Sequence, residues 1–489
     1  AHLIVMDPRG QTLKRHASRM LEFKPNKDVA LLNAMLNVIV TEKLYDQQYI
    51  QAHTSDFEAL KVHIQEYTPE AMAPECGIEA ETIREVARTY ARAEAAIIFW
   101  GMGISQSIHG TNNARCLIAL ALTTGHVGRP GTGLHPLRGQ NNVQGASDAG
   151  LIPMFLPDYR AVEDELARVE HEEFWGKTLA PKRGLTVVEI MNAIRAGEVR
   201  GMYVMGENPA MSDPDANHAR EALANLEHLV VQDIFLTETA FHADVILPAS
   251  AWPEKDGTVT NTNRQIQIGR QALAMPGDAK HDLWIINEIA RGIGLNWSYS
   301  HASEVFAEMA GIMPSLANIT WERLERESAV TYPCPATDKP GDDIVCGDGF
   351  PTTNGRGRMV PATYEPPGEP VDEDYPMVLS TGRQLEHWHT GAMTRRADVL
   401  DAIEPAAIAC LSPADLESLG VEGGDRIRVE TRRGAIETTV RVDDAVPKGM
   451  VFIPFCYAEA AANILTSPLL DPVGKIPEFK YCAAKVEAS

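Results

Sequence analysis

The order of apolar and polar positions gives the first two thirds of the chain an alternating pattern. Short apolar runs precede segments in which apolar residues recur every three or four positions, which predicts strands followed by amphipathic helices. We expect strands at residues 2–6, 95–100, 201–206, 228–233 and 244–248, and helices at residues 24–43, 79–93, 111–128 and 216–225. The first helix is expected to be capped near Asp28, and the third to be ended by Gly125 or Gly128. Strands that alternate with helices predict parallel sheets with helices on both faces.

The pattern changes in the last third of the chain. Residues 335–374 are rich in Gly, Pro and Asp, which indicates a linker or a surface excursion. Beyond them, GDRIRVETRRGAIETTVRV (424–442) alternates apolar and polar residues over two strands joined by a turn at Gly434. A separate, mainly β domain follows from this pattern, and we expect a barrel.

The predicted fold class is therefore α/β, with two Rossmann-like αβα domains, incomplete on the N-terminal side, and a C-terminal β-barrel. The expected domains are residues 1–140, 141–334 and 375–489, with the excursion 335–374 before the barrel. The sequence starts inside a predicted strand and without Met, so we expect the true N-terminus of the protein to lie elsewhere.

Composition and charge exclude several classes of function. The chain has 489 residues and a formal net charge of −23. This charge argues against a nucleic-acid or anionic-membrane partner, since either needs a basic surface. No apolar run is long enough to insert in a membrane. The seven cysteines form no C-x-x-C pair, so they offer no iron–sulfur or zinc ligand set, and their dispersed placement fits a reducing compartment.

Three polar loops follow predicted strands: GMGISQS (101–107), GENPAMSD (206–213) and QDIFLTET (232–239). Ligands of open α/β sheets lie beyond the C-terminal ends of the strands, so three such loops favour a large nucleotide-like ligand. An NAD-type site fits poorly, because Gln106 replaces the last Gly of the G-x-G-x-x-G pattern. A serine hydrolase is equally disfavoured, since the chain has no G-x-S-x-G motif.

Two further motifs carry polar side chains at close spacing. His387 and His389 have no carboxylate or Cys at ligand spacing nearby, so we expect both imidazoles to form hydrogen bonds rather than to hold a metal. PLRGQNNVQG (136–145) combines Arg138 with four side-chain amides. This stretch can be an irregular loop whose amides cap the neighbouring backbone. Alternatively, the planar guanidinium of Arg138 holds a small carboxylate or planar oxyanion beside a bulky cofactor.

The motifs together resemble one family, the bis-molybdopterin guanine dinucleotide oxidoreductases, and within it the catalytic (alpha) subunits of formate dehydrogenases. The resemblance covers essentially the whole chain, and LRGQNNVQG is the segment that distinguishes these subunits from related nitrate reductases. It rests on VMDPRG (5–10), WGMGISQ (100–106), HPLRGQNNVQGASDAG (135–150), MGENPAMSD (205–213), VVQDIFLTETAFHADVILPASAWPEKDGT (230–258), LSTGRQLEHWHTGAMTRR (379–396) and ANILTSPLLDPVGKIPEFKYCAAKVE (462–487).

The resemblance implies a double-psi type of barrel and a role for each matching residue. Arg138 is expected to bind the carboxylate of formate, with Gln140 nearby, in a reversible oxidation to carbon dioxide. The implied contacts of the first guanine dinucleotide are Asp7, Arg9, Asp28, Gly101, Met102, Gly103 and Gln106. Those of the second are Gly206, Glu207, Asn208, Gln232, Asp233 and Asp256. The barrel residues implied to close over the pterins are Thr381, Arg383, His387, His389, Thr390, Asn463 and Lys480.

The chain departs from the family pattern in one respect. Family members carry an N-terminal 4Fe-4S domain and a Cys or selenocysteine that ligates molybdenum or tungsten, and no segment here matches either. We therefore assign no metal ligand, and we expect residues 1–489 by themselves not to fold stably. The resemblance also implies a cytoplasmic enzyme that passes electrons to subunits with iron–sulfur clusters and with flavin or NAD. Two alternatives stay open, namely a nitrate or other oxyanion reductase on the same scaffold and a non-catalytic electron-transfer subunit.

Overall fold

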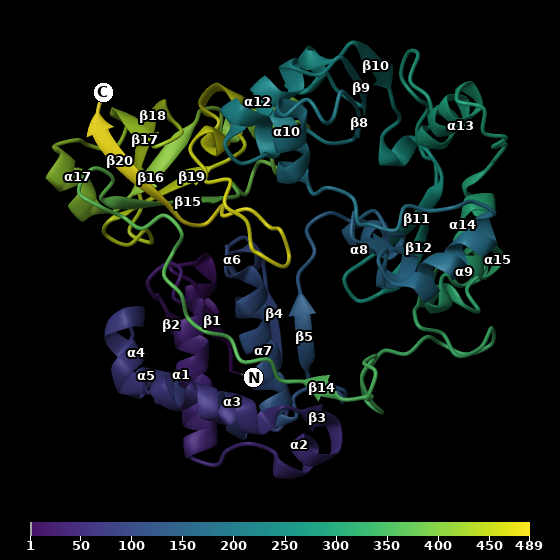
Figure 1. The fold of residues 1–489 in the computed structure, drawn as a ribbon. Helices are drawn as coiled ribbons and strands as arrows, with labels where there is room; N and C mark the ends of the chain where they lie inside the picture. The colour runs from purple at the N-terminus through teal and green to yellow at the C-terminus, as the bar shows by residue number, and fades with distance from the viewer. Residues whose placement is uncertain (1) are drawn as a thin grey trace. The chain divides into compact units, whose positions relative to one another are not determined.

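Helices and strands alternate through most of the computed structural model, which describes residues 2–489, and a closed barrel forms its C-terminal part (Figure 1). The mixed α/β class and the C-terminal barrel expected from the sequence are both confirmed. The chain divides into two compact units, each built from separate segments. Unit 1 comprises residues 1–135, 208–221 and 346–489, and unit 2 comprises residues 136–207 and 222–345.

The N-terminal part of unit 1 is mainly helical. Its strands are β1 (Ile4–Met6), β2 (Arg19–Leu21), β3 (Thr54–Ser55), β4 (Ile97–Trp100) and β5 (Gly133–Pro136). Its helices are α1 (Asp28–Thr41), α2 (Gln47–His53), α3 (Phe57–His63), α4 (Pro69–Cys76), α5 (Ala80–Arg92), α6 (Met102–Ser105) and α7 (Gly110–Thr124). β1 pairs with β2 in parallel, and β4 pairs with β5.

Helix α1 forms the centre of this part. The helix is apolar on nearly all sides, as in the stretch VALLNAMLNVIV, which is typical of a helix buried in a core. Leu31, Leu36 and Ile39 are fully buried and share one hydrophobic cluster with Ile83 of α5 and Leu120 of α7. This packing holds the loops after β1 and β4 on a rigid base.

The barrel contains β15 (Met377–Gly382), β16 (Ile408–Leu411), β17 (Arg426–Thr431), β18 (Gly434–Val442), β19 (Met450–Pro454) and β20 (Cys482–Ala488). The strands close in the order β15-β19-β16-β18-β17-β20. Alternate side chains point inward, so Leu379, Ile427 and Val429 are fully buried in its core. Unit 1 also holds α11 (Pro209–Ser212), β14 (Gly357–Arg358), α16 (Asp398–Ile403) and α17 (Pro413–Leu419).

Helix α1 starts at Asp28 with Lys27 in the cap position, so it begins near Asp28 as expected, although no side chain caps that helix end. The turn of the predicted hairpin needs correction. Gly434 is the first residue of β18 and pairs with Thr431, so the turn of the hairpin consists of Arg432 and Arg433. The predicted end of α7 at Gly125 is confirmed, because Gly125 has the positive φ of 67° that suits glycine at a helix C-terminus.

Unit 2 contains two sheets of three strands and the helices beside them. Its helices are α8 (Val143–Asp148), α9 (Glu165–Trp175), α10 (Val187–Arg195), α13 (Asp282–Gly292), α14 (Ala302–Ile312) and α15 (Trp321–Glu327), and the last residues of α12 (Ala216–Ala224). Its strands are β6 (Phe155–Leu156), β7 (Arg160–Ala161), β8 (Gly201–Met205), β9 (His228–Asp233), β10 (Val245–Pro248), β11 (Gly257–Thr260), β12 (Gln265–Gly269) and β13 (Ala329–Thr331). One sheet is parallel, in the order β10-β9-β8, and the other is antiparallel, in the order β11-β12-β13.

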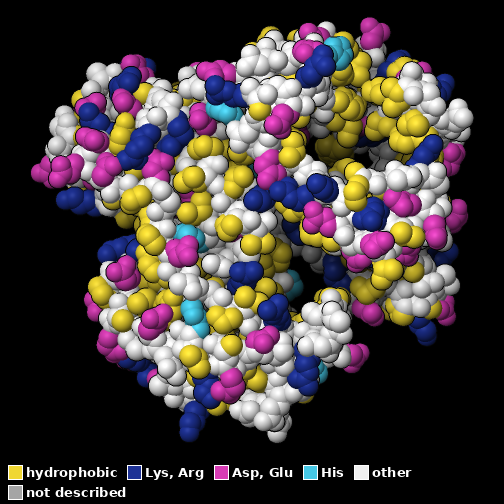
Figure 2. Space-filling view, in the orientation of Figure 1, with side chains coloured by type: hydrophobic (Ala, Val, Ile, Leu, Met, Phe, Trp, Pro, Cys, Tyr) yellow, Lys and Arg dark blue, Asp and Glu magenta, His cyan; other side chains and the backbone are white. Residues whose placement is uncertain are grey.

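The parallel sheet of unit 2 is apolar on both faces but buried on one. Val204 and Val231 point to the buried face. Tyr203, Val230 and Val245 lie side by side on the other face, and Tyr203 and Val245 are about two fifths exposed. Figure 2 shows many apolar side chains on the surface in this part of the molecule. Strands that read as continuous apolar runs are typical of parallel sheets covered on both sides.

Candidate functional site

The loops after β1 and β4 supply backbone and acidic groups in unit 1. Asp7 follows β1 directly, and its Oδ1 accepts a hydrogen bond of 2.8 Å from the backbone N–H of Arg9. Gly101 and Gly103 flank the start of α6, and a Cβ built on either glycine would meet no atom within 4 Å. Open space beside both glycines allows a ligand to approach the backbone closely.

Three cationic side chains act on one another in the same unit. Lys480 Nζ donates to the carbonyl oxygen of Thr381 at 2.6 Å, and the Arg9 guanidinium lies 3.6 Å from the centre of the Phe452 ring. Burial, together with the charges of Arg383 and Arg9, lowers the pKa of Lys480 to about 7. Desolvation also lowers the pKa of Arg383. Crowded cations of this kind favour an anionic ligand.

Two acids of the same unit have raised pKa values. Burial raises the pKa of Asp28 to about 7, and the neighbouring Asp7 carboxylate adds to the rise. Glu478 is 3% exposed, and burial raises its pKa to about 7 as well. Its Oε2 accepts from the backbone N–H of Ile108 at 3.0 Å, whereas its Oε1 has no hydrogen-bond partner among residues 2–489. The sequence pattern did not identify Glu478, although it stands two positions before Lys480 in the same motif.

The two histidines of the barrel loop differ in their surroundings. His387 is buried, and its ring nitrogens contact the carbonyl oxygen of Glu404 at 2.8 Å and Oγ1 of Thr394 at 3.3 Å. His389 has a positive φ of 48°, and its Nε2 is buried without a hydrogen-bond partner in the described chain. Burial, with the charge of Arg383, lowers its pKa to about 4, so the imidazole is neutral at pH 7. His389 is therefore the histidine with a polar atom left for a ligand. Thr390, next to it, is half-buried.

Asn463 links the barrel to the segment around α11. Its Nδ2 donates to the carbonyl oxygen of Ser212 at 2.7 Å, and its Oδ1 is buried without a partner within residues 2–489. Asn208 takes the N-cap position of α11 and is buried. Gln106 ends α6 and is half-buried, with its backbone N–H bonded to the carbonyl oxygen of Met102. Of the predicted site residues, unit 1 thus contains those of the first dinucleotide, those of the barrel and Asn208.

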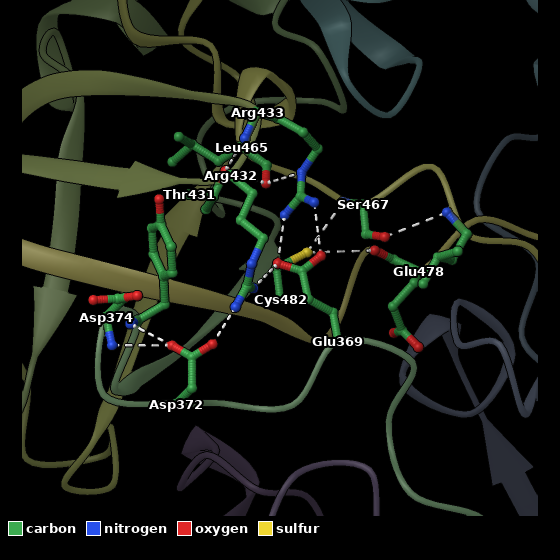
Figure 3. A network of polar contacts seen from close by, with 12 residues as sticks. Glu369, Asp372, Asp374, Thr431, Arg432, Arg433, Leu465, Ser467, Glu478 and Cys482 are labelled. Carbon is green, nitrogen blue, oxygen red and sulfur yellow. Dashed lines mark hydrogen bonds and ion pairs between the residues drawn. The ribbon is translucent and has the colours of Figure 1, made fainter.

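A network of ion pairs holds the residues before the barrel against its β17–β18 hairpin (Figure 3). Arg432 and Arg433 form the turn of that hairpin, and both bind Glu369, whose side chain is 12% exposed. Arg432 also pairs with Asp372. Close by, Cys482 Sγ accepts from the backbone N–H of Ser467 at 3.1 Å. These contacts fix the segment that leads into the barrel, and they lie beside the strand that follows Lys480.

Unit 2 contains the remaining predicted residues. Arg138 follows β5 and is half-buried, and its Nε donates to Oε1 of Gln144 at 3.1 Å. The two terminal nitrogens of its guanidinium have no hydrogen-bond or ion-pair partner within unit 2. Gln140 is exposed. The arrangement leaves two parallel N–H donors for a planar anion.

Gln144 belongs to a series of hydrogen-bonded side chains that the sequence did not reveal. Its Nε2 donates to Oδ1 of Asp148 at 2.7 Å and to the Tyr332 hydroxyl at 3.2 Å. The Tyr332 hydroxyl in turn donates to Oδ2 of Asp148 at 2.5 Å. The four-residue spacing of Gln144 and Asp148 is the one available sequence signal, because it places both on one face of a helix.

The residues after β8 and β9 form a second group in unit 2. Gly206 has a positive φ of 65°, and its N–H donates to the carbonyl oxygen of Gln232 at 2.8 Å. The side chain of Gln232 is buried, accepting from the Tyr203 hydroxyl and donating to Asp282 at 2.6 Å. Surrounding protein and the Asp233 carboxylate raise the pKa of Glu207. The structure therefore brings Gly206, Glu207, Gln232 and Asp233 to one end of the parallel sheet.

Asp256 precedes β11 and is exposed. Its Oδ1 accepts from the backbone N–H of Gln271 at 2.7 Å, and its Oδ2 lies 3.5 Å from Nε2 of His301. Within residues 2–489 no group of three or more His, Cys, Asp or Glu side chains could hold a metal ion. No disulfide joins cysteines within residues 2–489, and six of the seven cysteines are buried. In the part of the chain that the structure describes, no helix is both long and apolar enough to cross a membrane.

Comparisons with known proteins agree on one family. The model described as "Molybdopterin oxidoreductase" matches residues 1–292, and that described as "Molydopterin dinucleotide binding domain" matches residues 377–483. The chain is 44% identical to the F420-dependent formate dehydrogenase subunit alpha of Methanocaldococcus jannaschii, over 100% of this chain and 72% of that protein. It is 36% identical to formate dehydrogenase H of Escherichia coli, over 100% of this chain and 69% of that protein.

A solved structure shares the fold. Acetylene hydratase from Pelobacter acetylenicus superposes with a TM-score of 0.81 at 22% identity, over 100% of this chain and 74% of that one. At this identity the likeness concerns the fold alone. Proteins of other activities also match, among them an assimilatory nitrate reductase catalytic subunit.

Proposed function

The chain belongs to the molybdopterin oxidoreductase family, and from that premise we propose that it is the catalytic subunit of a formate dehydrogenase. The reaction converts formate to carbon dioxide, a proton and two electrons, and it can run in reverse. The observation that carries the proposal is the guanidinium of Arg138, held at Nε and without partners in its unit at both terminal nitrogens. A fork of this shape matches the two oxygens of a carboxylate.

The residues of unit 1 fit a molybdopterin dinucleotide. Its diphosphate would relieve the crowding of Arg9, Arg383 and Lys480, which depresses the pKa of the lysine. The buried unpartnered atoms Asn463 Oδ1 and His389 Nε2 offer an acceptor and a ring nitrogen for a polar ring system. When bound, the cofactor with its molybdenum or tungsten supplies the acceptor for two electrons.

We assign the two dinucleotides to separate sets of residues. Asp7, Arg9, Asp28 and the backbone around Gly101 to Gln106 would hold the first, a guanine dinucleotide. Gly206 to Asn208, with Asp233 and Asp256, would hold the second. Gln232 would support this set indirectly rather than contact the dinucleotide with its side-chain amide, because that amide already bonds to Tyr203 and Asp282. Residues 375–489 would form a molybdopterin dinucleotide-binding domain.

Arg138 performs the substrate-binding step of the proposed reaction. Two N–H groups donating to the two formate oxygens fix the plane of the anion and the direction of its C–H bond. The exposed amide of Gln140, two residues further on, can donate to one of the same oxygens. Orientation of a one-carbon anion requires such paired contacts, because formate has no other group to hold.

The electrons would leave through further iron–sulfur centres. We propose a 4Fe-4S cluster in a segment beyond these residues, and partner subunits with iron–sulfur clusters and flavin. The relatives include subunits named F420-dependent, so the terminal acceptor is to be tested with F420 as well as NAD. A cytoplasmic location agrees with the lack of disulfides among the described residues.

A nitrate or other oxyanion reductase is the second candidate, because nitrate is also a planar anion that a guanidinium fork can bind. The test is a pair of anaerobic assays on the purified holoenzyme. Formate-dependent reduction of a viologen dye is expected, without nitrate-dependent oxidation of the reduced dye. The reverse result would identify a reductase. Neither activity, in purified protein that contains no pterin and no metal, would indicate a non-catalytic electron-transfer subunit.

A further inference from the structure

We propose that Gln144 is a positioning residue that holds the Arg138 guanidinium in the orientation required for the substrate anion, and that Asp148 and Tyr332 fix Gln144 in turn. The inference rests on the proposed function, in which Arg138 binds formate. It concerns side chains that do not touch the substrate themselves.

The hydrogen bonds define which way the Gln144 amide points. Asp148 accepts on both oxygens, from Nε2 of Gln144 at 2.7 Å and from the Tyr332 hydroxyl at 2.5 Å. An ionised carboxylate only accepts, so the amide nitrogen of Gln144 must face Asp148. The amide oxygen then faces Arg138 and accepts from its Nε at 3.1 Å. One carboxylate thereby sets the direction of the guanidinium through one neutral side chain.

A neutral residue at position 144 leaves the two terminal nitrogens of the Arg138 guanidinium available to the substrate. A carboxylate touching Arg138 would form a paired salt bridge and occupy the donors that the substrate needs. An amide accepts from Nε alone and adds no competing charge. The negative charge of Asp148 stays one side chain away, where it supports the guanidinium without occupying its terminal nitrogens. Burial raises the pKa of Asp148, and the hydrogen bonds from Tyr332 and Gln144 oppose that rise.

Tyr332, at the end of this series of hydrogen bonds, is anchored in the antiparallel sheet of unit 2. Tyr332 follows β13 and is 9% exposed, and its backbone N–H donates to the carbonyl oxygen of Arg264 at 3.0 Å. A second attachment joins the residue before α8 to β11, where Asn142 Oδ1 accepts from the backbone N–H of Thr260 at 2.9 Å. Rigid support of this kind is what a positioning residue needs to hold a binding group within a fraction of an ångström.

The first test is Gln144→Met, which keeps the length of the side chain but removes its hydrogen bonds to Arg138, Asp148 and Tyr332. In the holoenzyme we expect the KM for formate to rise about tenfold or more, with kcat changed about threefold or less. Nitrate, used as a planar anion that has no C–H bond, should bind the oxidised holoenzyme more weakly by a similar factor in titration calorimetry. The control is Gln267→Met, because Gln267 is half-buried in β12 and its side chain bonds only to Gln265 within residues 2–489.

The second test is Gln144→Glu, which makes the KM depend on pH. The charged and titratable groups around position 144 are Arg138, Asp148, Tyr159 and Tyr332, and Asp158 acts on Asp148. While the introduced carboxyl group is protonated, it can donate to Asp148 and accept from Arg138, as the amide does. Once it loses its proton, it pairs with Arg138. The KM of this variant should therefore rise with pH by about tenfold or more relative to the wild type.

The outcomes separate this inference from the proposed function. If Arg138→Ala disrupts formate kinetics while Gln144→Met stays within about twofold of the Gln267→Met control, the positioning role is wrong and the function stands. If Arg138→Ala also leaves formate kinetics unchanged, the proposed function itself fails. Should Gln144→Met lose its pterin, the Gln144→Glu variant decides, and a KM with the pH profile of the wild type overturns the inference.

Discussion

Lys480 is the residue whose environment most clearly requires a ligand. Its ammonium is desolvated, and two arginines add positive charge, yet the hydrogen bond that Nζ forms goes to the uncharged carbonyl oxygen of Thr381. Asp7 and Glu478 offset only part of this cost. A half-buried cation with a lowered pKa and no full counter-charge destabilises the fold, and an anion bound there would remove that cost.

The substitution Lys480→Met should stabilise the cofactor-free protein and weaken cofactor retention. The folded-state pKa of about 7 lies below the ordinary value of 10.5, so the folded protein binds fewer protons than the unfolded chain between these pH values. Stability contributed by this group therefore rises with pH through that window, and the penalty is largest below pH 7. The gain in Tm of the variant should be greatest near pH 6 and should shrink towards pH 10.

Lys448→Met is the matched control for this prediction, because Lys448 is an exposed lysine of the same unit. Thermal unfolding of the apoproteins gives the change in Tm, and pterin analysis of the holoproteins gives retention. A Tm for Lys480→Met that is lower than wild type at pH 6, together with full pterin content, would show that the lysine has a purely structural role.

The candidate site residues that could be named from the sequence are those whose identity within a motif carries information. Arg138 and Lys480 belong to this class. The sequence did not indicate Gln144, Asp148 or Glu478, because their roles depend on partners far away in the chain. Tyr332 lies 184 residues from Asp148, and Ile108 lies 370 residues from Glu478. No local pattern reports a hydrogen bond of that sequence separation.

At the scale of elements, the segment before the barrel is more ordered than its composition suggested. Residues 335–374 read as a linker, yet β14 pairs with β3 and Met359 is fully buried in the core around α1. Glu369 binds both arginines of the β17–β18 turn (Figure 3). The hairpin itself was predictable from alternation, whereas the ion pairs that hold the segment against it were not.

Glu369→Ala should destabilise the protein by about 3 kcal/mol, because it leaves the nearly buried Arg433 guanidinium without its carboxylate. Urea unfolding measures the loss. The comparison is Glu437→Ala, which removes an exposed pair with Arg426 and should cost about 1 kcal/mol or less. Equal losses in the two variants would contradict the view that the Glu369 network holds the segment in place.

At the scale of the whole molecule, the alternation of strands and helices and the final barrel were predictable from periodicity. Which segments of the chain make up each unit was not predictable from periodicity. Unit 1 joins the N-terminal residues, a short segment around α11 and the barrel, which are separated by long stretches of unit 2. Such assembly depends on tertiary contacts that hydropathy along the chain does not encode.

Unit 2 has an exposed apolar surface that should be detectable in solution. Tyr203 and Met205 of β8 are each 43% exposed, and Phe241 and Trp252 are 78% and 73% exposed. Residues 1–489 alone should therefore bind the dye ANS and unfold without a single cooperative transition. Phe241→Ser combined with Trp252→Ser should reduce the ANS signal. A cooperative melt of this chain with no ANS binding would contradict the prediction.

The central claim is that Arg138 binds formate for oxidation at a molybdopterin centre. Its most direct test is the steady-state rate of formate-dependent viologen reduction by the wild-type holoenzyme and by Arg138→Ala, at matched pterin and metal content. The account predicts saturable reduction by the wild type and a fall of about 100-fold or more in kcat/KM for the variant, since two charged hydrogen bonds are lost. Equal kcat/KM values in the two proteins would contradict it.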